Sequence, residues 1–327
     1  MHILITGAAG MIGRKLTDRL IRDGGLNNKP ISKLTLADIV TPPSPSGFSG
    51  EVDLRTCDLS SPDEARKIVS DAPNVIFHLA AVVSGEAEAD FDKGYRINLD
   101  GTRGLLEALR QRGGGEHTKF IFTSSVAVFG APFPPAIEDE FHLTPLTSYG
   151  TQKAIGELLL ADYTRRGLVD GVGIRLPTIC VRPGKPNKAA SGFFSSIIRE
   201  PLIGEEAVLP VPETVRHTHA SPRSAVGFLV HAASLTREAL GPRVNLTMPG
   251  VSCTVGEQIE ALRRTAGDRV AARIRREPDP TITQIVGGWP MRLGGQRAQA
   301  LGFRAETTFE EILRAHIEDE LGGRIAA

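Results

Sequence analysis

The chain has 327 residues, of which 41% are hydrophobic and 23% are charged, and its 38 Lys and Arg residues balance 38 Asp and Glu residues. This composition is typical of a water-soluble globular protein with roughly one to three domains. A formal charge of zero provides no overall field that would attract nucleic acid or an anionic membrane, so we expect neither as a partner.

Signals for membrane insertion, secretion and metal binding are weak. The longest apolar stretch, residues 75–83, is far shorter than the roughly 20 residues that a membrane-spanning helix needs. A strand is expected to start at His2, which leaves no room for a signal peptide. Cys57, Cys180 and Cys253 are too few and too scattered for a disulfide framework or a zinc site. We therefore expect a cytoplasmic protein with reduced thiols and no metal.

Short apolar segments alternate with amphipathic ones in the first half of the chain. Strands separated by helices form right-handed βαβ units and a parallel sheet. The pattern predicts an α/β fold with a Rossmann-type, doubly wound parallel sheet, in which ligands bind beyond the carboxyl ends of the strands. The expected strands are 3–5, 34–37, 75–79, 120–122 and 172–175, and the expected helices are about 11–23, 62–70, 87–112 and 148–166. Residues 24–30 and 41–50 are loops by composition.

The pattern changes after about residue 176, where prolines become frequent. We expect residues 1–176 to form the sheet domain, with 221–248 returning to extend the sheet. Residues 177–220 and 249–327 are expected to form a smaller C-terminal cap over the strand ends. The further helices expected here are about 189–200, 221–235, 254–266 and 307–320.

A glycine-rich turn follows the first expected strand. Gly7, Gly10 and Gly13 lead into a helix through Met11 and Ile12. In a strand–turn–helix setting, such glycines allow a tight turn, a close approach of phosphate to the backbone, and close packing of helix on sheet. The free N–H groups at the helix start attract the phosphates. The pattern predicts a site for the pyrophosphate of a dinucleotide.

Two acidic residues bear on the choice of dinucleotide. Asp38 ends the second strand, where its carboxylate accepts hydrogen bonds from the adenosine ribose and repels a 2′-phosphate. We therefore expect NAD, although Arg14 is either an exposed helix residue or a contact for a 2′-phosphate. Asp58 and Leu59 follow a third strand, which lies between the expected strands 34–37 and 75–79 and makes 75–79 the fourth strand. Asp58 either meets the adenine edge there or serves as an N-cap or turn residue.

The fourth strand ends in small residues. Leu79, Ala80 and Ala81 would let the ribose of the cofactor lie against the backbone. His78 is expected to be a packed strand residue and not a ligand. Residues 1–176 are thus interpreted as an NAD-binding domain.

Tyr149 and Lys153 stand one helical turn apart, on the same face of an expected helix. A free phenol has a pKa of about 10, and a cation about 4 Å away at an effective dielectric of ~20 stabilises the phenolate by ~4 kcal/mol. That stabilisation corresponds to about three pKa units and would bring Tyr149 near 7, where it can act as a base. Ser125, with Ser124 as its rival, would hold the substrate hydroxyl, and Thr123 would contact the cofactor.

Motifs spread over residues 1–180 resemble those of the extended short-chain dehydrogenase/reductase superfamily, which includes NAD-dependent sugar-nucleotide epimerases and dehydratases. The resemblance implies that Tyr149 is the base and that Lys153 binds the ribose and lowers the phenol pKa. It also implies that Ser125 binds the hydroxyl and that Asn98 and Pro177 lie at the cofactor. The motifs are Thr6-Gly7-x-x-Gly10-x-x-Gly13, Asp38, Asp58, Ser124-Ser125-x-x-Val128-Phe129-Gly130 and Tyr149-x-x-x-Lys153.

Within this superfamily, residues 78–85, 147–153 and 175–187 resemble the bacterial D-erythronate 2-dehydrogenases. The resemblance implies NAD-dependent oxidation of the C2 hydroxyl of a small sugar acid. Phe129 replaces the usual Tyr of the epimerase segment, which favours this assignment. Residues 126–127 are Val-Ala, so the acid pair of the 4,6-dehydratases is missing and dehydration has no proton donor.

We expect Ser84, Ser125 and Tyr149 to surround the reacting hydroxyl. Arg182 or Asn187 would lie at the far end, because a planar guanidinium suits a carboxylate. Arg216 is an alternative ligand for that carboxylate.

Two other functions stay open at this point, an epimerase that retains its cofactor and a cofactor-sensing binding protein. By analogy with the superfamily, helices 87–112 and 148–166 are expected to form a homodimer interface.

Overall fold

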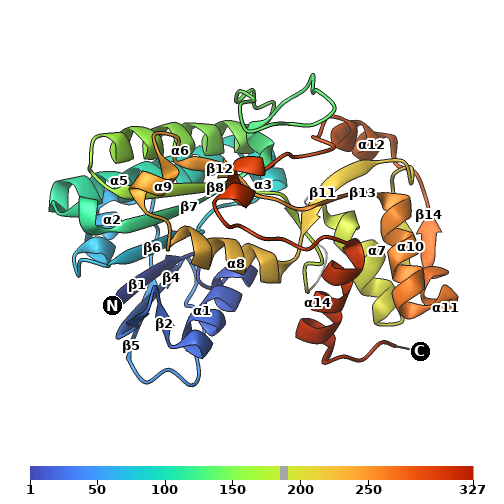
Figure 1. Ribbon diagram of the computed structural model, residues 1–327, viewed down its shortest axis with the longest axis horizontal. Coiled ribbons are helices and arrows are strands. Elements are labelled where there is room, and N and C mark those ends of the chain that lie inside the picture. The colour runs from blue at the N-terminus through green and yellow to red at the C-terminus, as the bar shows by residue number, and fades with distance from the viewer. Residues whose placement is uncertain (185–190, 327) are drawn as a thin grey trace.

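The computed structural model describes residues 1–184 and 191–326. Its centre is a seven-stranded sheet with the strand order β12-β8-β7-β6-β1-β4-β5, and every neighbouring pair of strands is parallel (Figure 1). The chain builds outward from β1 to β5, then returns to β6 and builds outward in the other direction. The switch point therefore lies between β1 and β6, as expected of a doubly wound Rossmann-type sheet. The strands are β1 (His2–Thr6), β4 (Lys33–Asp38), β5 (Glu51–Thr56), β6 (Val75–His78), β7 (Lys119–Ser125), β8 (Asp170–Leu176) and β12 (Asn245–Thr247).

Helices cover both faces of this sheet, because successive side chains of a strand point to opposite sides. In β1, Ile3 and Ile5 belong to an apolar cluster shared with α1 and α8. Leu4 belongs to a second cluster, shared with α2, α5 and α6. The two clusters hold the helices on opposite sides of the sheet (Figure 1). These helices are α1 (Met11–Asp23), α2 (Pro62–Val69), α5 (Gly101–Arg112), α6 (Ser148–Arg165) and α8 (Pro222–Ala232).

The expected helix 87–112 is wrong as a single element. The chain instead forms α3 (Ser84–Ala89), α4 (Phe91–Gly94), a π-helix η1 (Tyr95–Asp100) and then α5. Asp90 separates α3 from α4 and caps α4, since its side chain accepts a hydrogen bond from the backbone N–H of Lys93. Short π-helical segments are rare and occur often at functional sites, and this one lies beside the candidate site described below.

Other differences from the expected elements concern short segments. The expected loop 24–30 contains a hairpin of β2 (Gly25–Leu26) and β3 (Lys29–Pro30), and its turn residues Asn27 and Asn28 have φ values of 53° and 59°. Asn tolerates this conformation, which two-residue hairpin turns require. β5 is the strand expected before Asp58, for which the sequence predicts no range. β12 lies within residues 221–248, the segment expected to extend the sheet, and pairs with β8.

The cap segments, residues 177–220 and 249–327, contain a third apolar cluster that includes Phe194, Ile197, Leu262 and Leu313. Figure 1 shows most of their elements beside one end of the central sheet. A three-stranded sheet in the order β13-β11-β9 lies among them. Their elements are β9 (Thr178–Ile179), α7 (Gly192–Leu202), β10 (Ala207–Leu209), β11 (Arg216–Ala220), β13 (Val251–Thr254), α10 (Val255–Ala266), α11 (Asp268–Ala271), β14 (Ile274–Arg276), α12 (Pro280–Gly287), α13 (Gln296–Ala300) and α14 (Phe309–Leu321).

The remaining described elements are short, namely η2 (Gly115–His117), η3 (Val126–Val128) and α9 (Arg237–Leu240). Within residues 1–184 and 191–326, no helix combines the length and hydropathy that a bilayer crossing requires.

Candidate active site

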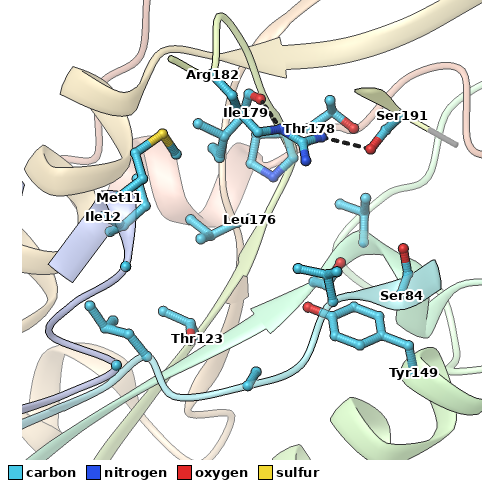
Figure 2. A pocket seen from close by; sticks show the side chains of 18 of the residues that line it. Met11, Ile12, Ser84, Thr123, Tyr149, Leu176, Thr178, Ile179, Arg182 and Ser191 are labelled. Carbon is cyan, nitrogen blue, oxygen red and sulfur yellow. Dashed lines mark hydrogen bonds between the residues drawn. The ribbon is translucent and has the colours of Figure 1, made fainter. Parts of the chain in front are cut away.

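Two adjoining cavities, of about 500 and 410 Å³, lie beyond the carboxyl ends of the central strands. Five residues line both of them, so the two form one continuous cleft. The shared residues are Gly7, Gly10, Leu79, Ala81 and Val82. The larger cavity, shown in Figure 2, extends from Met11 and Ile12 to residues of the cap segments. The smaller one extends along the ends of β4 and β5.

The glycine turn after β1 leaves no room for a side chain at Gly7 or at Gly13. Gly7 has a φ of +74°, and a Cβ atom there would lie 2.7 Å from the backbone N of Ala80. A Cβ on Gly13 would lie 2.3 Å from the carbonyl O of Gly7. Gly10 directly precedes α1, so the free N–H groups of the first turn of α1 lie at the cleft. This backbone cradle fits a pyrophosphate, as the sequence predicts.

Asp38 is held at the rim of the smaller cavity. Its Oδ2 accepts a hydrogen bond of 2.9 Å from the backbone N–H of Ala9, and its Oδ1 accepts one of 2.7 Å from Ile39. A carboxylate has about four acceptor sites, so both oxygens can still accept bonds from ribose hydroxyls. Arg14, the alternative contact for a 2′-phosphate, is exposed and lies outside the residues that line either cavity.

Asp58 and Leu59 also line the smaller cavity. The Asp58 carboxylate closes a turn by accepting bonds from the backbone and hydroxyl of Ser60, at 3.0 and 2.6 Å. It also forms an ion pair of 2.8 Å with Arg96, which sequence reasoning missed. The contacts of Asp58 within the protein therefore agree with its expected role as a turn residue. The N-cap alternative is wrong, because Ser61 precedes α2.

Two buried polar residues near the end of β6, His78 and Asn98, have side chains that are hydrogen-bonded to other protein groups. His78 bonds the hydroxyls of Thr6 and Thr102 at 2.8 and 3.0 Å, and burial lowers its pKa to about 3. It is thus a packed strand residue. Asn98 donates to and accepts from the backbone of Val82, at 3.2 and 2.8 Å, and lines neither cavity. Its contacts position Val82, which lines both.

Tyr149, Ser125 and Lys153 meet at the larger cavity. Thr147 caps α6 by accepting a hydrogen bond from the backbone of Gly150, so Tyr149 and Lys153 lie in the first two turns. Ser125 ends β7, lines the same cavity as Tyr149, and acts to lower the pKa of Tyr149. A phenol, a hydroxyl and an ammonium group thus converge from one helix and one neighbouring strand.

The expected acidification of Tyr149 to near 7 is not achieved by the protein groups alone. Burial raises the pKa of Tyr149 to about 12, against the opposing effects of Ser125 and Arg182. The Lys153 Nζ lies 5.8 Å from the centroid of the Tyr149 ring and donates a hydrogen bond of 2.8 Å to the carbonyl of Thr123. The ammonium is therefore held by a carbonyl of β7 while it lies near the phenol ring. Burial also lowers the pKa of Lys153 to about 8.

Ser124, the rival of Ser125, is bound elsewhere. Its hydroxyl donates a hydrogen bond of 2.5 Å to Glu157, which lies one turn beyond Lys153 on α6. Glu157 is 1% exposed and forms an ion pair of 2.7 Å with Arg175 of β8. The charge of Glu157 acts to raise the pKa of Lys153. Sequence reasoning missed this pair, although its position four residues after Lys153 puts Glu157 on the same helix face.

The rest of the larger cavity is lined by α3, the end of β8 and the cap segments. Ser84, the first residue of α3, and Pro177 both line the cavity. Asn187 lies outside the described residues. Sequence reasoning assigned no role to several other cavity residues. They are Leu176, Thr178, Ile179, Ser191, Gly192, Ser195 and Arg199.

Arg182 lies among these cap residues. Its Nε donates to the carbonyl of Ile179 at 3.1 Å and its Nη2 to the hydroxyl of Ser191 at 2.6 Å (Figure 2). Burial lowers its pKa. The alternative, Arg216, bonds the carbonyl of Ser252 and forms an ion pair with a glutamate outside the cleft. Arg182 lines the cavity and Arg216 does not. Within the described residues, no group of three or more His, Cys, Asp and Glu is arranged to hold a metal.

Comparison with known proteins connects this cleft to a family. The model of the "NAD dependent epimerase/dehydratase family" matches residues 3–223. A D-erythronate dehydrogenase of Cupriavidus necator is 49% identical over 98% of both chains. A second one, from Haemophilus influenzae, is 41% identical over 98% of this chain and 100% of its own.

Solved structures show the same fold. A structure described as a nucleoside-diphosphate-sugar epimerase from Agrobacterium tumefaciens is 65% identical, has a TM-score of 0.97, and is matched over 100% of this chain and 96% of its own. An L-threonine dehydrogenase from Cupriavidus necator shares only 23% identity, with a TM-score of 0.83 over 98% and 99% of the two chains, and so supports the fold alone. The chain therefore belongs to the NAD dependent epimerase/dehydratase family, an extended short-chain dehydrogenase/reductase family, and uses NAD as its cofactor.

Proposed function

We propose that this protein oxidises the C2 hydroxyl of D-erythronate to the 2-oxo acid, with hydride transfer to NAD. The observation that carries the proposal is Arg182, a partly buried cation that lines the larger cavity. Within the described residues, Arg182 forms no ion pair with a carboxylate, and residues 185–190 include neither Asp nor Glu. A buried charge without a counter-ion is costly, and an anionic substrate group would offset that cost.

Tyr149, Ser125 and Lys153, which line the same cavity, fit the oxidation of an alcohol. Tyr149 would take the hydroxyl proton, while Ser125 would hold the same oxygen by a second hydrogen bond. Bound NAD supplies the hydride acceptor and a positive charge that adds to that of Lys153. Lys153 would bind the cofactor ribose and stabilise the phenolate. Ser84 is the further hydroxyl that we assign to the substrate. The sugar acid would then lie with C2 at Tyr149 and its carboxylate at Arg182.

The names of the two curated relatives support this substrate, at 49% and 41% identity over nearly the full chain. The 65% identical structure described as a nucleoside-diphosphate-sugar epimerase supports the alternative, an epimerase that returns the hydride to its substrate. Release of product distinguishes the two. The dehydrogenase would accumulate NADH in proportion to D-erythronate consumed, whereas an epimerase would show no net NADH from a nucleotide sugar.

Two substitutions test the assignment. Tyr149→Phe removes the base, and we expect NADH formation to fall by roughly 10²–10⁴-fold with NAD binding retained. Arg182→Gln removes a charged hydrogen bond of about 1.5–3 kcal/mol, which predicts a loss of kcat/KM for D-erythronate of roughly 10–150-fold. The matched control is Arg216→Gln, an arginine outside the cleft. Equal losses in the two arginine variants would remove Arg182 from the substrate site.

We also propose that the protein is a homodimer that associates through residues 87–112 and 148–166. Leu158 of α6 is 65% exposed and Phe91 of α4 is 58% exposed, so both helices offer apolar surface that a partner subunit would cover. Sedimentation or gel filtration of the purified chain is expected to give twice the mass of the monomer. A monomer at every concentration would contradict the proposal.

A further inference from the structure

Thr178 of β9 lines the larger cavity (Figure 2) and belongs to a chain of hydrogen bonds that leads away from it. β9 pairs with β11, which brings the Thr178 Oγ1 to 2.8 Å from the Nε2 of His217. The Nδ1 of the same ring lies 2.8 Å from the carbonyl O of Pro290. Three segments of the cap therefore fix the orientation of one hydroxyl at the cleft wall.

The hydrogen-bond partners define which way each proton points. A carbonyl oxygen can only accept, so the Nδ1 of His217 carries the hydrogen. Burial lowers the pKa of His217 to about 4, and the ring packs against Phe194 and Trp289, each with ring centroids 5.5 Å away. A neutral ring protonated at Nδ1 has a lone pair at Nε2. The hydroxyl of Thr178 must then donate to Nε2, and its own lone pairs are all that it can offer to a ligand.

We propose that Thr178 is a specificity-determining residue that accepts a hydrogen bond from a substrate hydroxyl other than the one that is oxidised. This inference rests on the proposed function and deepens it. His217 is the positioning residue, because it takes the only hydrogen that Thr178 has.

The cleft then has a donor position and an acceptor position. Arg182 offers only donors, so it suits a carboxylate. Thr178 offers only an acceptor, so it suits a hydroxyl and repels a carboxylate or carbonyl oxygen. A substrate with an apolar group at this position would leave the acceptor without a partner, which is the basis on which sites reject analogues that lack a hydroxyl. The substrate class is therefore an acid with at least one hydroxyl beyond the carbon that reacts.

The test compares three variants with three acids. Thr178→Val and Thr178→Ala remove the acceptor, with and without a side chain of similar size, and Thr178→Ser retains it. The substrates are D-erythronate and its 3-deoxy and 4-deoxy analogues, assayed by NADH formation at saturating NAD. Thermal unfolding of each variant shows whether the buried His217 still supports a folded protein.

We expect Thr178→Val and Thr178→Ala to lower kcat/KM for D-erythronate by about 3–10-fold, which is the value of one neutral hydrogen bond. Thr178→Ser should keep the wild-type kcat/KM. For the analogue that lacks the bonded hydroxyl, wild-type and variant enzymes should have equal kcat/KM values. The same fold loss with all three acids, or no loss with D-erythronate, would overturn the role of Thr178 alone. If the wild-type enzyme oxidises none of the three acids, the proposed function fails as well.

Discussion

Replacement of Lys153 by Met tests whether the ammonium group acidifies Tyr149. The Nζ lies 5.8 Å from the centroid of the phenol ring. At an effective dielectric of ~20, two unit charges at that distance interact by about 3 kcal/mol, which corresponds to about 2 pKa units. Loss of the cation destabilises the phenolate, so the pKa of Tyr149 rises. At a pH well below the pKa of Tyr149 in both enzymes, Lys153→Met should therefore have a phenolate fraction and a rate about 100-fold lower than the wild type.

The pH dependence of kcat at saturating NAD and substrate measures this effect. Burial lowers the pKa of Lys153 to about 8, so the wild-type ammonium is charged below that pH and neutral above it. The deficit of Lys153→Met should therefore be large below pH 8 and should shrink above it. Lys153→Arg is the control, because arginine stays charged throughout this range. A deficit that is the same at every pH would refute the electrostatic reasoning and leave Lys153 as a ribose ligand only.

Three further substitutions test other parts of the structure. Asp38→Asn removes the charge that repels a 2′-phosphate, so the ratio of the KM values for NADP and NAD should fall, and an unchanged ratio would argue against this role. Gly13→Ala places a Cβ atom 2.3 Å from the carbonyl of Gly7, so NAD titration should show a large loss of affinity, and wild-type affinity would contradict the close packing. Glu157→Gln leaves Arg175 buried without its partner, and we expect urea denaturation to show a free energy of unfolding lower by about 3–5 kcal/mol. A stability equal to wild type would show that the ion pair is dispensable.

Local patterns in the sequence predicted the parts of the fold that depend on neighbouring residues. The expected helices 11–23 and 254–266 agree with α1 and α10 to within a residue at each end. Strand 75–79 agrees with β6 equally well. The two helices have a clear apolar periodicity and a glycine or capping residue at a boundary, and the strand is a short continuous apolar run. The expected helix 87–112 failed because its amphipathic pattern continues through Asp90, where the backbone departs from helical geometry.

Motif spacing predicted which residues line the cleft but not what each one contacts. Gly7, Asp38, Ser125 and Tyr149 line the cavities, because residues that follow parallel strands meet at one edge of the sheet. Spacing could not assign Asn98 to the backbone of Val82, since that bond depends on the π-helix.

What the sequence determined by itself is the set of groups at the cleft, because glycine turns, strand ends and helical spacing are local properties. Only the tertiary structure decided their protonation and direction. Burial raises the pKa of Tyr149, Lys153 donates to the carbonyl of Thr123, and the bonds of His217 orient Thr178. The physical reason is that desolvation and hydrogen-bond partners come from segments distant in the chain, and one-dimensional spacing carries no information about them.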